Sequence, residues 1–266
     1  MASGVPPGGG RSRLGPVERT PTRTTGAPNS PRTAVVWRVL TTELGRHGTR
    51  SLTVIDVGGG TGGFAVPLAE AGHHVTVVDP NPDALAALTR RAHDAGVPGR
   101  VRAVQGDGDR LAGLVPAGGA DLVLCHSLLE VVDDPGGVLR AVAAALRPGR
   151  AASVLVANRV AAVLGRAVTG HLDAAAALLA GPDGRAGPHD TLRRRFDVAT
   201  VAALLTASGL ALEGWHGVRV LADLVPAATA DLDPAALLDL ELSLSGRPPY
   251  RDIAAQLHLL ARRPER

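Results

Sequence analysis

Glycines and acids at a spacing typical of nucleotide binding occur in the first third of the chain. Segment 54–64 reads VIDVGGGTGGF, in which Gly58, Gly60 and Gly63 fit the pattern GxGxxG after an apolar, β-branched run. Asp79 lies 21 residues after Gly58, at the end of a second such run. A side chain at the glycine positions would obstruct the turn or the approach of a ligand, and a carboxylate can accept hydrogen bonds from both ribose hydroxyls. The spacing therefore predicts a nucleotide-containing ligand, and both NAD and S-adenosylmethionine fit it.

Strand and helix patterns alternate around this turn. Short apolar, β-branched runs predict buried strands, and helical patterns separate them. One helix start is clear, because Asn81 can cap it, Pro82 suits its first position and Asp83 faces the positive end of its dipole. We expect strands at 52–57, 74–79, 101–105, 121–125 and 151–156, and helices at 31–44, at 64–71, from 81 and from 134 to a stop at 147–149.

The second half of the chain departs from this alternation. Two helical pieces rich in alanine and leucine fall in residues 158–195, which we interpret as an insertion that covers the pocket. A capped helix at 198–208, a strand at 210–220, a helix at 234–244 and a last strand at 256–261 follow. Together the elements predict an α/β fold, a Rossmann-like, doubly wound and mainly parallel sheet of seven strands, with its ligand beyond the carboxyl ends of the strands.

The charge distribution argues against a dedicated nucleic-acid surface. The first 50 residues hold eight arginines and two glutamates, whereas the remaining 216 hold 20 arginines and 23 acids. The chain has no lysine, so arginine usage and a basic tail account for the pI near 10.2. Residues 1–31 are rich in Gly, Pro, Ser, Thr and Arg and predict a disordered tail, which leaves 32–266 as the folded domain.

Composition also limits the location and the metal content that we expect. No run reaches the ~18 consecutive apolar residues of a membrane helix, and the N-terminus lacks the apolar stretch of a secretory signal. A single cysteine, Cys125, excludes an internal disulfide, and no Cys/His cluster has metal-ligand spacing. We therefore expect a cytoplasmic protein with no membrane partner and no metal.

The segment Asp56-Val57-Gly58-Gly59-Gly60-Thr61-Gly62 resembles the first motif of the class I S-adenosylmethionine-dependent methyltransferases. Residues 106–109, after the third strand, fall where that family contacts the adenine. The resemblance implies S-adenosylmethionine as cofactor, with Asp56 and Gly60 beside it in the turn, and a sheet closed by a reversed last strand.

Four further segments narrow the resemblance. RTAVVW (32–37), HSLLEVVDDP (126–135), GVRV (217–220) and PYRDIAAQLHLLARR (249–263) are similar, in order and spacing, to segments of the bacterial tRNA carboxymethoxyuridine carboxyl methyltransferases. The likeness covers about 230 residues. It implies that cofactor contacts fall on Arg32, Gly58, Gly59, Asp79, Gly108, Asp109 and His126.

Departures from that family concern the methyl acceptor. The family has a tryptophan where this chain has Val131, and an arginine and a tyrosine where it has Ala255 and Gln256. Two Trp, two Phe and one Tyr also give the chain few aromatic faces on which an extruded base could stack. The acceptor is thus either a carboxylate of a modified wobble uridine in tRNA or a small molecule methylated on oxygen or nitrogen. A nicotinamide-dependent oxidoreductase remains the third alternative.

Different residues would serve these acceptors. A carboxylate is ionised at neutral pH and needs only an arginine fork to orient it, for which Arg219 and then Arg159 are the candidates. A hydroxyl or amine would need a base, and His126 is placed for that role. Asn158, after the fifth strand, either contacts the acceptor at the pocket rim or caps a loop.

Overall fold

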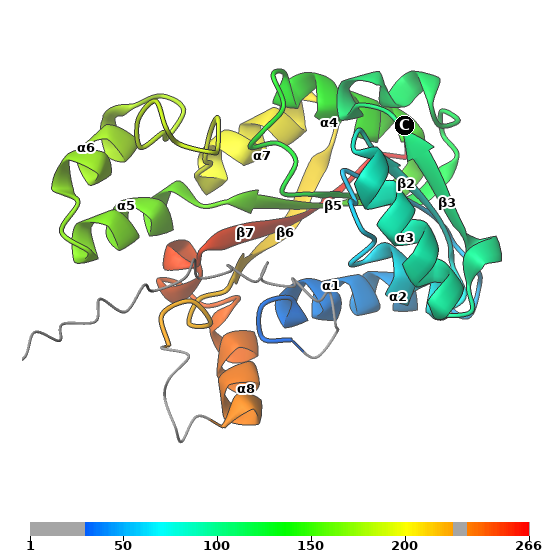
Figure 1. Ribbon diagram of the computed structural model, residues 1–266, viewed down its shortest axis with the longest axis horizontal. Helices are drawn as coiled ribbons and strands as arrows, with labels where there is room; N and C mark the ends of the chain where they lie inside the picture. The colour runs from blue at the N-terminus through cyan, green and yellow to red at the C-terminus, as the bar shows by residue number, and fades with distance from the viewer. Residues whose placement is uncertain (1–29, 226–232, 266) are drawn as a thin grey trace, which may run out of the picture.

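The computed structural model describes residues 30–225 and 233–265, so most of the predicted basic tail lies outside the described residues (Figure 1). Seven strands form one sheet in the order β3-β2-β1-β4-β5-β7-β6. All neighbouring pairs are parallel except those made by β7, which runs antiparallel to both β5 and β6. The strands are β1 Thr53–Val57, β2 His74–Asp79, β3 Val101–Gln105, β4 Ala120–His126, β5 Leu146–Ala157, β6 Ala211–Val218 and β7 Gln256–Arg262. The doubly wound, mainly parallel sheet with one reversed last strand is confirmed.

Alternate side chains of the strands pack on opposite faces of the sheet. In β1, Val54 packs in one buried cluster with α1, α2 and α3, whereas Ile55 and Val57 pack in a second with α4 and α7. A parallel sheet covered on both faces needs apolar residues at successive positions, which explains why neighbouring residues such as Val54 and Ile55 are both apolar. The helices are α1 Ala34–Gly45, α2 Ala65–Glu70, α3 Pro82–Asp94, α4 Pro135–Ala145, α5 Arg159–Val168, α6 Leu172–Ala180, α7 Val198–Ala207 and α8 Pro234–Leu244, and the short 3₁₀ turns are Pro98–Arg100, Gly108–Gly113 and Tyr250–Ile253.

Helix starts follow the capping residues that the sequence indicates. The Asn81 side chain accepts a hydrogen bond from Asp83 N at 2.9 Å, and Asp197 caps α7 through Thr200 N at 2.8 Å. The expected end of α4 at 147–149 is wrong, because the helix ends at Ala145 and the chain passes directly into β5. A register irregularity, between the pairs that Ala120 and Leu122 make with β5, takes up Pro148 and Gly149 within the strand.

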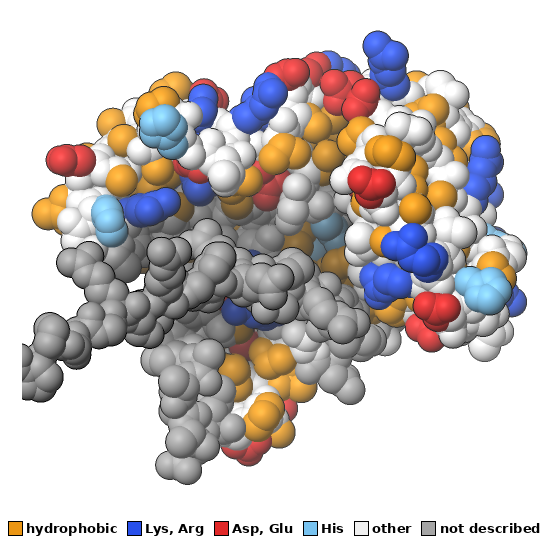
Figure 2. All heavy atoms as spheres, in the orientation of Figure 1, with side chains coloured by type: hydrophobic (Ala, Val, Ile, Leu, Met, Phe, Trp, Pro, Cys, Tyr) orange, Lys and Arg blue, Asp and Glu red, His pale blue; other side chains and the backbone are white. Residues whose placement is uncertain are grey.

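Residues 158–195 form a helical insertion that starts and ends beside the carboxyl end of β5. A bridge between Asn158 and Phe196 closes it, and α5 and α6 pack together and extend away from the sheet (Figure 1). Apolar side chains lie on the surface of this pair; Val168 and Leu172 are 85% and 66% exposed. On the face drawn in Figure 2, arginine and acidic side chains are interspersed over the helices. Within the described ranges, no helix is long and apolar enough to span a membrane.

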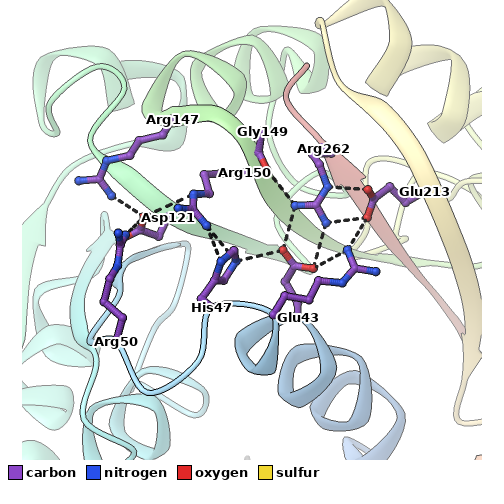
Figure 3. Close-up of polar contacts among 10 residues, drawn as sticks. Glu43, His47, Arg50, Asp121, Arg147, Gly149, Arg150, Glu213 and Arg262 are labelled. Atoms are coloured by element: carbon purple, nitrogen blue, oxygen red, sulfur yellow. Dashed lines mark hydrogen bonds and ion pairs between the residues drawn. The ribbon is translucent and has the colours of Figure 1, made fainter. Parts of the chain in front are cut away.

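A network of ion pairs joins α1 to the strands at the edge opposite the glycine turn (Figure 3). Arg262 of β7 bonds both oxygens of the buried Glu43 at 3.0 and 2.9 Å and both oxygens of Glu213 at 2.5 and 2.7 Å. Asp121, only 2% exposed, accepts from Arg50 at 2.7 Å and pairs with Arg147 at 2.6 Å. The network connects segments that are far apart in sequence, so it fixes the end of α1 against β4, β6 and β7.

Candidate functional site

A cavity of about 420 Å³ opens at the carboxyl ends of β1 and β4. This is the position at which the order of the strands predicts a ligand. Its walls come from the start of α1, the glycine turn, the ends of β4 and β5, the residue that follows β6 and the first residue of β7. The lining residues are Arg32, Thr33, Val36, Asp56, Gly58, Gly59, Thr61, Gly63, Phe64, His126, Ser127, Leu155, Arg219 and Gln256.

The backbone of the glycine turn packs closely against neighbouring side chains, which leaves no room for a Cβ. Gly58 has φ +74°, in the left-handed region, and a Cβ there would also come within 3.2 Å of the Leu128 side chain. At Gly59 the backbone is ordinary, but a Cβ would lie 2.5 Å from Cγ of Asp56. Both positions therefore require glycine, and the bare backbone of the turn forms a cradle that lines the cavity together with Asp56.

Asp79 is aimed at this turn from the end of β2. Its Oδ2 accepts a hydrogen bond from Gly60 N and its Oδ1 accepts one from Asn81 N, both at 2.9 Å. Each carboxylate oxygen keeps a second lone pair, so two acceptor positions remain beside the turn. Neither Asp79 nor Gly60 lines the cavity; they lie next to it along the ends of β1 and β2.

Gly108 and Asp109 continue this side of the site after β3. Gly108 is buried, and a Cβ on it would approach the Leu128 side chain to 3.1 Å and Val57 to 3.4 Å. Asp109 is exposed on the following 3₁₀ turn. Both residues lie outside the cavity lining, so the structure places the predicted cofactor residues in two groups, one inside the cavity and one at its side.

Burial sets the charge states of the two titratable residues at the cavity floor. Asp56 is 3% exposed, and burial together with the charge of Asp79 raises its pKa to about 7. Burial lowers the pKa of His126 to about 3, so its ring is neutral at physiological pH. The Cys125 thiol beside it is also buried, which raises its pKa and leaves it unreactive.

Two arginines reach the cavity from opposite ends of the chain and share one acid. Arg32 pairs with Asp223 at 2.9 Å, and Arg219 pairs with the other oxygen of the same carboxylate. The Nε of Arg219 is buried and has no hydrogen-bond partner among the described residues. Arg219 also has φ +61°, which is strained for a residue with a side chain.

Glu241 of α8 holds the turn that carries Arg219 and Asp223. Its fully buried carboxylate accepts hydrogen bonds from the backbone N–H groups of Val220, Leu221 and Ala222 at 3.0, 2.6 and 2.5 Å. Three such bonds to one carboxylate offset the strain at Arg219 and fix the turn at the cavity rim. Sequence reasoning did not identify Glu241 or Asp223, because neither belongs to a motif.

Asn158 and Arg159 are not among the residues that line the cavity, and their role in binding the acceptor stays a prediction. The Asn158 side chain donates to Asp252 O and Ala254 O at 2.8 and 2.7 Å and accepts from Val160 N, so it caps α5. Arg159 donates to Gly181 O at 2.8 Å and pairs with Asp197. Among the described residues that line the cavity, none comes from 158–195, and the cover over the pocket stays a prediction.

Other lining residues were also missed. Gln256, which the sequence presents only as a departure from the family, donates to Ser127 Oγ at 3.2 Å inside the cavity. Ser127 has φ +53°, and Phe64 packs edge-on against His126 with ring centroids 4.7 Å apart. The position of Ser127 after a strand is the only signal that could have indicated it. Over the described ranges, no group of three or more His, Cys, Asp or Glu side chains could hold a metal ion.

Comparisons with known proteins agree with this geometry. A family model described as a methyltransferase domain matches residues 54–149. The tRNA 5-carboxymethoxyuridine methyltransferase of Escherichia coli strain K12 is 30% identical over 235 residues, 88% of each chain. A ubiquinone biosynthesis O-methyltransferase from Xanthomonas euvesicatoria is 35% identical over 164 residues, 62% of this chain and 64% of the other. The crystal structure of magnesium protoporphyrin IX methyltransferase from Synechocystis with bound S-adenosylhomocysteine has a TM-score of 0.57 at 15% identity and covers 87% of this chain and 83% of that one.

Proposed function

The chain belongs to the class I S-adenosylmethionine-dependent methyltransferases, and we propose that it transfers the methyl group of this cofactor to a carboxylate. One observation carries the proposal. Arg219, at the cavity wall, already pairs with a carboxylate, that of Asp223, whose other oxygen pairs with Arg32. Planar guanidinium groups in this arrangement match the geometry of a carboxylate.

We infer that the residues at the turn hold the cofactor. When bound, S-adenosylmethionine supplies an electrophilic methyl group on a positively charged sulfur. The free acceptor positions of Asp79 suit ribose hydroxyls, and the cradle at Gly58 and Gly59 suits the amino-acid end of the ligand beside Asp56. Arg32 suits the carboxylate at that end, and Gly108, Asp109 and His126 complete the set that we propose.

The pKa of Asp56 gives a testable pH dependence. Raising the pH from 6 to 8 ionises Asp56, whose pKa is about 7, and creates a negative partner for the ligand ammonium group. We expect the affinity for S-adenosylhomocysteine, measured by calorimetry, to rise about tenfold over this range, because the ionised fraction rises by that factor. Asp56→Asn should remove the pH dependence, and an unchanged profile in this variant would exclude Asp56 as its source.

The same ionisation acts on stability in the opposite sense. The folded state raises the pKa of Asp56 above its unfolded value near 3.8, so folding favours the protonated form. This contribution to the free energy of unfolding is fully present below pH 3.8 and is lost as the pH rises through about 7. Ligand binding and stability of the free protein therefore respond to Asp56 with opposite signs.

The state of His126 favours an acceptor that needs no base. A neutral imidazole whose pKa is about 3 is a weak base at physiological pH, so it would remove a proton from a hydroxyl or amine poorly. A carboxylate acceptor is already ionised and needs only position and exclusion of water. Arg219 can supply the position, because it lines the cavity and its guanidinium group already pairs with the Asp223 carboxylate there.

The function of the E. coli relative supports a specific acceptor. We propose the carboxylate of carboxymethoxyuridine in tRNA, because the likeness to that methyltransferase extends over 88% of both chains. One observation favours a small-molecule acceptor instead. Among the described residues that line the cavity, Phe64 alone has a Phe, Tyr or Trp ring on which a base could stack. That ring already packs on Trp37 and His126.

Transfer to tRNA can be measured directly. Protein incubated with methyl-labelled S-adenosylmethionine and tRNA from an E. coli strain without its own carboxymethoxyuridine methyltransferase should label the tRNA. Mild alkali should release this label as methanol, because methyl esters hydrolyse under conditions in which methyl ethers and N-methyl groups are stable. Arg219→Gln should lower kcat/KM for tRNA about 30-fold, as expected for loss of a charge-assisted bond, with at most a small change in the affinity for S-adenosylhomocysteine.

Arg166→Gln is the matched control, since Arg166 is exposed on α5 away from the cavity. Its kcat/KM should equal that of the wild type. Alkali-stable label would reject a carboxylate acceptor, and no label on tRNA together with intact binding of S-adenosylhomocysteine would favour the small-molecule acceptor.

A further inference from the structure

A row of polar side chains crosses the sheet interior next to the cavity. His126 Nε2 of β4 lies 2.8 Å from Ser153 Oγ of β5, and the same Oγ lies 2.7 Å from His258 Nε2 of β7. The strand register explains the alignment, because Leu155 is paired with both His126 and His258, and Ser153 is two residues from Leu155 on the same face. Ser153 and His258 are fully buried, so water does not reach them.

The serine hydroxyl imposes a rule on the two rings. A hydroxyl has one hydrogen to donate and lone pairs to accept with. Since both of its partners are ring nitrogens at hydrogen-bond distance, Ser153 donates to one ring and accepts from the other. One Nε2 therefore carries a hydrogen and the other does not. Both rings are neutral, because burial lowers the pKa of His126 and that of His258.

The rule also fixes the protonation of the other nitrogen of His126, the buried Nδ1. In a neutral imidazole, Nδ1 has a hydrogen only when Nε2 lacks one. His126 lines the cavity, and its Nδ1 is buried with no partner among the described residues. His258 does not line the cavity, yet its tautomer decides whether Nδ1 of His126 accepts or donates a hydrogen bond.

We propose that Ser153 and His258 are positioning residues that hold the His126 ring in one orientation and one tautomer for the ligand of this cavity. The proposal rests on the proposed function only in taking S-adenosylmethionine as that ligand. The edge-on contact of Phe64 holds the ring from the cavity side. With the ring fixed before the ligand arrives, binding does not have to order it.

Long-range ¹H–¹⁵N NMR on protein labelled at histidine tests the rule in the wild type. Its signals can be assigned by comparison with His126→Asn and His258→Asn. We expect each ring to show a single neutral tautomer, with the hydrogen of His126 and that of His258 on nitrogens of opposite type. Identical tautomers in the two rings, or a charged ring at neutral pH, would overturn the proposal whatever the ligand is.

Substitution of Ser153 tests the consequence for binding. In Ser153→Ala we expect a mixture of His126 tautomers and an S-adenosylhomocysteine Kd about tenfold higher, whereas Ser153→Thr, which keeps the hydroxyl, should restore both. Ser208→Ala is the control, because Ser208 is a buried serine at the end of α7, and it should leave both the tautomer and the Kd unchanged.

If Ser153 had only a structural role, Ser153→Ala would lower the thermal midpoint of unfolding without changing the tautomer or the Kd. That result would reject the proposal. Failure of the wild type to bind S-adenosylhomocysteine would instead count against the proposed function, while the tautomer measurement would still decide the present one.

Discussion

Asp79→Asn should raise the Kd for S-adenosylhomocysteine by at least about 100-fold, because two charge-assisted hydrogen bonds to the ribose are lost at roughly 1.5 kcal/mol or more each. The wild-type carboxylate accepts from Gly60 N and Asn81 N, one on each oxygen. An amide in the same place must direct its NH₂ group at one of these N–H donors. The substitution therefore also disturbs the backbone of the turn, although it hardly changes the volume of the side chain.

Isothermal titration calorimetry can measure this change. Asp83→Asn is the matched control, because Asp83 is an exposed acid in the first turn of the same helix and does not line the cavity. It should bind S-adenosylhomocysteine as the wild type does. Affinity of Asp79→Asn within a few-fold of the wild type would mean that Asp79 only shapes the turn and does not contact the ligand.

Arg262→Met should lower the free energy of unfolding by about 3–5 kcal/mol, the usual cost of leaving a buried ion without its partner. Arg262 donates to both oxygens of Glu43, whose side chain is 1% exposed, and to both oxygens of Glu213 (Figure 3). Methionine fills a similar volume but offers no hydrogen to either carboxylate. Urea unfolding of the two proteins at pH 7 measures the difference.

The loss should depend on pH in a direction that identifies Glu43. Burial acts to raise the pKa of Glu43, but hydrogen bonding and the charge of Arg262, with Arg46 and His47, outweigh it and hold the pKa below 4.5. In the wild type this stabilisation is present above pH 4.5 and is lost as the pH falls through the folded-state pKa. In Arg262→Met burial dominates, so the deficit should shrink as acid protonates Glu43.

A surface pair provides the control for this experiment. Arg140 pairs with Asp134 at 3.2 Å, and both side chains are more than half exposed. Arg140→Met should change the free energy of unfolding by less than about 1 kcal/mol. Since Glu43 and Arg262 do not line the cavity, S-adenosylhomocysteine should bind Arg262→Met with wild-type affinity at temperatures where the variant is folded. A deficit as small as that of Arg140→Met would show that the remaining partners of Glu43, Arg46 and His47, are sufficient to compensate its charge.

Much of the fold could be predicted from the sequence because its causes are local. Asn81 and Asp197 cap helices through N–H groups two or three residues away, and β1 and β2 are buried on both faces, so most of their residues are apolar. The end of α4 could not be placed in this way. Pro148 and Gly149 normally stop a helix, but pairing of Leu146 with Ala120 carries them into β5.

The turn of the site was also within reach of the sequence. The backbone at Gly58 needs a residue without a side chain, and Asp79 reaches the turn because β1 and β2 are adjacent parallel strands. Such requirements appear as residue types at fixed spacing. The sequence by itself thus determined the sheet, the position of the glycine turn and the acid beside it.

Only the tertiary structure decided how the rest of the site is assembled. Arg32, Arg219 and Asp223 meet although nearly 190 residues separate the first two, and Ser153 joins His126 to His258 across three strands. The same holds for the charge states at the cavity floor, since the pKa of Asp56 depends on burial and on Asp79. Long-range contacts and burial arise when the chain folds and brings distant segments together, so no local pattern records them.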